Sequence, residues 1–161
     1  MDDAAEFAAW QDKVRGSNIS TASLLATDYL NHFNEIIMLL GMMPDMPDII
    51  DECRGWQPKG YAEHFQDSGF RDKELAIEAY DHVPKRFKVP FEETVEQMNR
   101  VVESAITKID TANGDGDPAS AMFKAQTASR LLQHMLDIAS AIIHGSGVTM
   151  SQADIDAFMR E

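Results

Sequence analysis

Pairs of acidic and amide side chains on expected helix faces are the residues of this sequence that are best placed to do chemistry. Three such pairs are Asn31 with Glu35, Glu93 with Gln97, and Glu96 with Asn99. Side chains three or four residues apart meet on one face of a helix. An amide can orient an attacking water and a carboxylate can hold a cationic group, and such positioning supplies much of the rate in several hydrolytic reactions. We therefore take these six residues as catalytic candidates, and note a reversed pair at Gln133 and Asp137.

Histidines offer an alternative chemistry, a metal or small ligand held between helices. The helical neighbours with suitable donor atoms are His32 with Asp28 and Glu35, and His134 with Asp137. A di-iron site of the four-helix type needs a Glu-x-x-His pair on each of two helices, and the sequence contains no such pair. We predict no resident metal and no cofactor, and keep a metal- or ligand-binding bundle as an alternative.

Apolar periodicity predicts the helices that must position these pairs. Apolar residues recur at alternating steps of four and three in three long segments, at about 21–43, 90–112 and 118–143. The third segment carries a second apolar row beside the first, so we expect it to be the most buried helix. Pro90 and Pro118 are expected at first helical positions, where the missing N–H costs least.

Shorter helices and their breaks complete the expected architecture. They are predicted at 3–15, 61–66 and 71–82, between glycine and proline breaks. Long amphipathic helices bury their apolar seams most economically by antiparallel packing. The sequence therefore predicts an all-α protein, an antiparallel helical bundle of about four main helices over residues 1–145. A flexible linker and a C-terminal recognition helix are expected over residues 146–161.

Composition and charge narrow the class of protein. The chain has 161 residues, of which 44% are hydrophobic and 25% charged, as is ordinary for a soluble domain. Its 27 acidic and 14 basic residues give a net charge of −13, which repels nucleic acid and favours basic partners. The single cysteine, Cys53, suits a reducing compartment. The acidic start Met1-Asp2-Asp3 and the lack of a long apolar run lead us to expect a cytoplasmic protein without a membrane span.

The C-terminal segment has the features of a short docking helix. It follows the hinge-like sequence Gly145-Ser146-Gly147 and begins with Ser151, a good N-cap residue. Acidic residues occupy the first turn, where the helix dipole favours them. One apolar stripe follows at Ile155, Phe158 and Met159. We expect this stripe to be exposed, because such a helix is suited to docking in a groove on a basic partner.

This segment resembles the receiver-binding peptide of the FliM flagellar switch proteins. The shared pattern is Ser-Gln-Ala-Asp-Ile-Asp-Ala followed by two large apolar residues, over positions 151–159. A similar acidic helix ends the CheZ chemotaxis phosphatases. The resemblance implies that the partner is a CheY-like receiver domain. The residues implied in binding are Met150, Ser151, Gln152, Asp154, Ile155, Asp156, Phe158 and Met159.

The function expected from this resemblance is regulation of chemotaxis or motility in the cytoplasm. The chain would bind a phosphorylated CheY-like receiver and could promote its dephosphorylation, as CheZ does, through one of the acid–amide pairs. Any Mg²⁺ would belong to the receiver. A non-catalytic adaptor of a two-component pathway is the alternative with the same partner, and the uninterrupted apolar seams leave a homodimer open.

Overall fold

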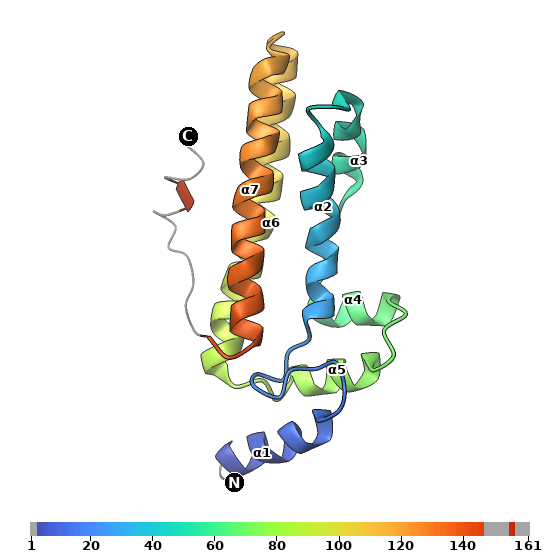
Figure 1. The fold of residues 1–161 in the computed structure, drawn as a ribbon, viewed down its shortest axis with the longest axis vertical. Coiled ribbons are helices and arrows are strands. Elements are labelled where there is room, and N and C mark those ends of the chain that lie inside the picture. Colours follow the sequence, from blue (N-terminus) through green and yellow to red (C-terminus); the bar gives the residue numbers. More distant parts are fainter. Residues whose placement is uncertain (1–2, 147–154, 157–161) are drawn as a thin grey trace.

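Three upright helices form the body of the protein. The computed structural model describes residues 3–146 and 155–156, and within these ranges every regular element is a helix. The upright helices are α2 (Asn31–Met42), α6 (Lys85–Gly114) and α7 (Pro118–Ile143). They run side by side, with α7 antiparallel to α6 and to α2 (Figure 1). The all-α prediction is confirmed in the described part of the chain, where α6 and α7 have 30 and 26 residues and α2 has 12.

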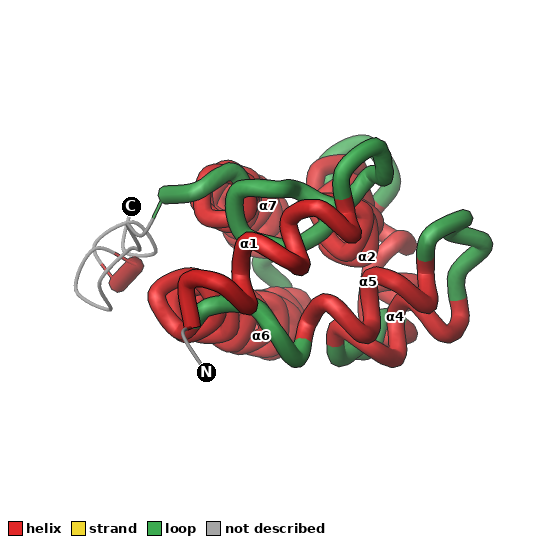
Figure 2. The backbone as a smooth tube through the Cα atoms, turned by 90° about the horizontal axis from the view of Figure 1, so that it is seen from below, coloured by secondary structure: helices red, strands yellow, loops and turns green. Residues whose placement is uncertain are grey.

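Short helices cover the sides and one end of this bundle. Both views show α1 (Asp3–Val14), α4 (Tyr61–Asp67) and α5 (Lys73–Tyr80) lying across one end, near the start of α6 (Figures 1 and 2). The helix α3 (Ile50–Gly55) packs beside α2. His82 ties α1 to the end of α5, because it stacks on Trp10 at 4.3 Å and contacts the Glu6 carboxylate at 2.7 Å.

The helix α7 is the central element, as its two apolar rows predict. It packs against both α6 and α2. Its fully buried apolar side chains are Ala125, Ala128, Leu131, Leu132, Met135, Ala139, Ile142 and Ile143. Its start also follows the prediction, because Asp117 caps the helix by accepting a hydrogen bond from the Ser120 backbone N–H at 3.1 Å, and Pro118 occupies the first turn.

The helix expected over 21–43 is shorter than predicted. The short 3₁₀ helix η1 (Thr27–Leu30) precedes α2, and residues 15–26 before it are not helical. Leu24 has a φ of +72°, which breaks any helix there. The buried Ser23 hydroxyl donates to the carbonyl of Ile143 at 2.5 Å. The tertiary contact with the end of α7 therefore replaces the helical turn that the apolar spacing favours.

The helix expected to start at Pro90 begins five residues earlier, at Lys85, so Pro90 lies inside α6. The added turn buries Phe87, and the Arg86 guanidinium lies over the rings of Phe7 and Phe87 at 5.2 and 4.7 Å. The proline lacks the N–H that would bond to the carbonyl of Arg86, and it is tolerated near the helix start because packing against α1 stabilises the added turn.

The structure describes two residues of the expected recognition helix, Ile155 and Asp156. Ile155 is 3% exposed and belongs to the contiguous apolar core, so the expectation of an exposed side chain at this position is wrong in this conformation. Asp156 is exposed. The other predicted docking residues lie outside the described residues: Met150, Ser151, Gln152, Asp154, Phe158 and Met159. In the described residues, none of the helices has the length and apolarity that crossing a membrane requires.

Candidate functional site

An open polar cleft of about 480 Å³ lies between α2 and α7. It also reaches η1 and the loop before α5. Its polar side chains are Asn18, Thr27, Asp28, Asn31, Asn34, Asp137 and Ser140. We call it the α2–α7 cleft. Amide side chains from α2 and a carboxylate from α7 line this cleft together.

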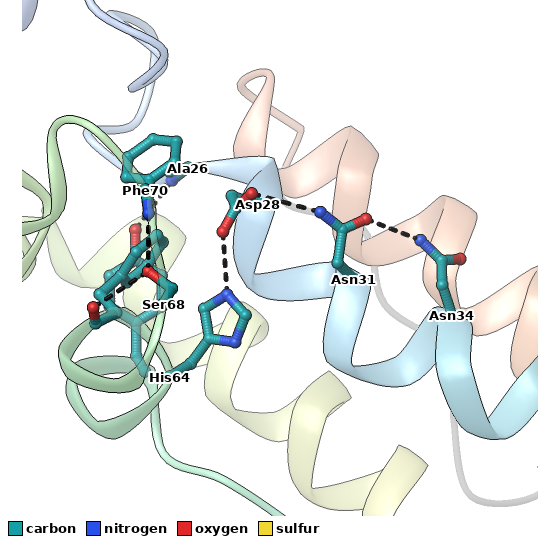
Figure 3. A network of polar contacts seen from close by, with 9 residues as sticks. Ala26, Asp28, Asn31, Asn34, His64, Ser68 and Phe70 are labelled. Atoms are coloured by element: carbon teal, nitrogen blue, oxygen red, sulfur yellow. Dashed lines mark hydrogen bonds and ion pairs between the residues drawn. The ribbon is translucent and has the colours of Figure 1, made fainter.

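A chain of polar contacts runs along the α2 side of this cleft (Figure 3). The His64 Nε2 lies 3.0 Å from Asp28 Oδ2. The Asn31 amide nitrogen donates to Asp28 Oδ1 at 3.2 Å, and the Asn34 amide nitrogen donates to Asn31 Oδ1 at 3.1 Å. Each contact fixes the orientation of the next side chain, so Asn31 and Asn34 are presented to the cleft in defined orientations.

Local sequence and packing explain this arrangement. Asp28, Asn31 and Asn34 are spaced by three residues, which places them on one face of η1 and α2. His64 comes from α4 and is only 13% exposed at its side chain. The α4 helix is anchored there because the Tyr61 hydroxyl accepts a hydrogen bond from the Ala26 N–H at 2.8 Å, and because the ring of His64 packs edge-on against Tyr29.

The opposite wall of the cleft is formed by α7. The Gln133 side-chain nitrogen donates to Asp137 Oδ1 at 3.2 Å, and Asp137 lines the cleft. The two helices pack against each other, and an added Cβ at Gly41 of α2 would lie 3.4 Å from the Ser129 hydroxyl of α7, which is an ordinary contact distance. That hydroxyl donates to the carbonyl of Ile37 at 3.0 Å. A carboxylate on α7 therefore faces amides on α2 across an open, solvent-accessible site.

The predicted pair of Asn31 and Glu35 is only partly supported by this geometry. Asn31 lies in the cleft, but its hydrogen bonds are to Asp28 and Asn34. Glu35 is exposed and is not among the cleft residues. Asn34 is not among the catalytic candidates predicted from the sequence, although its three-residue spacing from Asn31 places both side chains on one helix face.

The other predicted pairs lie on α6, away from the cleft. Glu93 is exposed and Gln97 is half-buried. Glu96 forms an ion pair with Arg100 at 2.5 Å. Glu96 and Asn99 line a different pocket, between α6 and the segment before α4. The structure thus separates these four candidates from Asn31.

The histidines proposed as metal ligands have other surroundings. His32 stacks on Trp56 at 4.6 Å and its Nε2 lies 2.5 Å from the carbonyl of Gln57. Burial lowers the pKa of His32 below its usual value of 6.5. His134 is exposed on α7. In the residues that the structure describes, no group of three or more His, Cys, Asp or Glu side chains is placed to hold a metal ion.

Comparisons with known proteins found no match: no family model, no curated protein and no solved structure matches this chain.

Proposed function

We propose that this protein regulates a phosphorylated CheY-like receiver domain of a chemotaxis or motility pathway. The observation that carries the proposal is the α2–α7 cleft, where the carboxylate of Asp137 faces the amides of Asn31 and Asn34. The similarity of residues 151–159 to receiver-binding peptides supports the choice of partner. An open polar cleft also fits a protein partner, which must bring its reacting group to the site.

The chemistry required of such a helper is modest. Water attacks the phosphorus of the receiver's aspartyl phosphate, the bond from phosphorus to the aspartate oxygen breaks, and inorganic phosphate and a free carboxylate result. An amide such as that of Asn34 would hold the attacking water, and Asp137 would hold the receiver's catalytic lysine. The receiver would supply its own Mg²⁺. Orientation and electrostatic positioning account for most of the rate in phosphoryl transfer.

The C-terminal segment would dock on the receiver and raise its local concentration at the cleft. Since Ile155 is buried in the described conformation, docking through this residue requires it to leave the core. The receiver would thus contact the protein at two places. The C-terminal segment would bind it, and the weaker contact at the cleft would promote its dephosphorylation.

The decisive experiment measures phosphate loss from a phosphorylated chemotaxis receiver with and without the full chain. We expect the full chain to accelerate the loss. A peptide of residues 146–161 should bind the phosphorylated receiver more tightly than the unphosphorylated form, and should leave the rate unchanged. Substitutions Asn34→Ala and Asp137→Asn should each lower the acceleration, by about 100-fold where water or lysine positioning is lost.

Gln126→Ala is the matched control, because Gln126 is an exposed amide of α7 that does not line the cleft. Equal losses of acceleration in Asn34→Ala, Asp137→Asn and Gln126→Ala would show that the cleft takes no part in the dephosphorylation. Binding without any acceleration would select the non-catalytic adaptor, and absence of binding by both chain and peptide would overturn the proposal.

A further inference from the structure

The side-chain hydrogen bonds along the α2 wall of the cleft all run in one direction (Figure 3). The amide nitrogen of Asn31 donates to Asp28 at 3.2 Å, and the amide nitrogen of Asn34 donates to the oxygen of Asn31 at 3.1 Å. In both bonds the donor belongs to the residue further along the chain. The series therefore ends at Asn34, whose nitrogen is committed to Asn31 and whose oxygen is left for a group in the cleft.

The carboxylate of Asp28 sets this direction. An ionised carboxylate has only acceptor atoms, whereas a primary amide has an acceptor oxygen and a donor nitrogen. Asn31 must therefore turn its nitrogen toward Asp28, which leaves its oxygen on the side of Asn34. Because that oxygen can only accept, Asn34 in turn must present its nitrogen to it. An acceptor at the start of the series thus decides which atom stands at its end.

The start of the series is also its best-fixed part. The Nε2 of His64 lies 3.0 Å from the second oxygen of Asp28, so this nitrogen carries the hydrogen of the contact. The side chains of His64 and Asp28 are 13% and 30% exposed, whereas Asn31 and Asn34 are exposed residues. The anchored end is therefore partly buried, and the end at Asn34 is the one that a partner can reach.

We propose that Asp28 is a positioning residue, which makes Asn34 present its carbonyl oxygen rather than its amide nitrogen to the cleft. The inference rests on the proposed function for the group that Asn34 meets, the attacking water. This water donates one hydrogen bond to Asn34 Oδ1 and keeps a lone pair for the phosphorus. A bond from an N–H would instead occupy a lone pair of the water and weaken it as a nucleophile. Asp28 itself touches no reacting atom.

The test exchanges the carboxylate and the amide between positions 28 and 31. Asp28→Asn places an amide at the start of the series. This amide can bond in either direction, so Asn34 loses its fixed orientation. The double variant Asp28→Asn/Asn31→Asp keeps the natural net charge and places a carboxylate next to Asn34. Since this carboxylate accepts only, Asn34 should again present its oxygen to the cleft.

The orientation of Asn34 is read by ¹H–¹⁵N NMR, without a receiver. In the natural chain one N–H of the Asn34 side chain is bonded to Asn31 and is protected from exchange with water. We expect Asp28→Asn to speed this exchange about threefold, and the double variant to restore the natural rate. Asp45→Asn is the matched control, because it makes the same substitution at an exposed residue that does not line the cleft, and it should change nothing.

Phosphate loss from a phosphorylated receiver gives the second readout. Asp28→Asn should lower the maximal acceleration about tenfold, with little change in the receiver concentration that gives half of it, and the double variant should recover most of the loss. A merely structural role of Asp28 predicts no recovery, because both natural residues are then absent.

Unchanged Asn34 exchange in Asp28→Asn, or no restoration of exchange and acceleration in the double variant, would overturn the inference. Backbone amide spectra, recorded first, show that each variant is folded. If the natural chain does not accelerate phosphate loss, the proposed function fails, and the exchange rates still decide whether Asp28 sets the orientation of Asn34.

Discussion

Asp28 joins the elements that build the α2–α7 cleft. One of its carboxylate oxygens meets His64 from α4 and the other accepts from Asn31 at the start of α2. His64 is largely buried and Asp28 is partly exposed at the cleft. A hydrogen-bonded carboxylate in such a place controls the orientation of the amides beside it, although it need not touch a reacting group itself.

His64 should therefore position Asn31 through Asp28. Substitution His64→Ala is expected to lower the free energy of unfolding by about 1–2 kcal/mol, because Asp28 loses a partly buried partner. It should also shift the ¹H–¹⁵N signals of the Asn31 side-chain amide, whereas His64→Gln, which can still donate to Asp28, should restore much of both effects. Unmoved Asn31 signals in His64→Ala would contradict the positioning role.

His32 should make the free energy of unfolding decrease as the pH is lowered. Burial lowers its pKa in the folded protein below the unfolded value of 6.5, so the unfolded chain binds more protons in the window between the two. The stability associated with His32 is thus complete above pH 6.5 and is lost as the pH falls through the folded pKa. An NMR titration should give a midpoint below 6.5 for the His32 ring, and urea unfolding of His32→Gln should show a weaker decline toward acid. A midpoint at or above 6.5 would contradict this.

At the scale of elements, helix boundaries are set by packing as much as by local signals. Pro90 is a strong local signal for a helix start, yet α6 begins at Lys85 because Phe87 gains burial and Arg86 gains contact with the ring of Phe7. Leu24 shows the opposite case: a residue inside the segment predicted to be helical is held in a left-handed conformation beside the buried Ser23. In both cases tertiary contacts outweigh a local preference in backbone conformation, whose free energy is a few kcal/mol at most.

Pro90→Ala tests where α6 begins. Because the structure places Pro90 inside the helix, alanine restores a backbone N–H that can bond to the carbonyl of Arg86. We expect the free energy of unfolding to rise by about 1 kcal/mol or more, measured by urea denaturation. Pro118→Ala is the control, since Pro118 occupies the first turn of α7 and should give little change. Equal effects at the two prolines would indicate a helix start at residue 90.

At the scale of the whole molecule, the burial of Ile155 competes with the proposed binding of a receiver through the same side chain. Ile155 belongs to the apolar core in the described conformation. Binding of a receiver through this residue would have to offset its burial, which is typically worth about 1.5–3 kcal/mol for a side chain of this size. The segment would then be a docking element whose release is coupled to partner binding.

Substitution Ile155→Ala measures how much the burial of this side chain contributes to the free energy of unfolding. If Ile155 is packed in solution, the free energy of unfolding should fall by about 2 kcal/mol or more. Met38→Ala is the matched control, because Met38 is 58% exposed on α2 and its loss should stay within about 0.5 kcal/mol. A change at Ile155 no larger than at Met38 would mean that Ile155 is free in solution, in accord with the exposed stripe predicted for the docking helix.

The amino-acid sequence by itself determined the all-α class, the position of α7 and its capping by Asp117, because apolar periodicity and capping act over a few neighbouring residues. It also identified Asn31 as a candidate, since spacing along one helix is a local property. The assembly of the cleft was decided only by tertiary structure. His64 reaches Asp28 across 36 residues of sequence, and Asp137 and Asn31 line one cleft because α2 packs against α7. Contacts between distant segments depend on the packing of whole helices, and no local spacing encodes them.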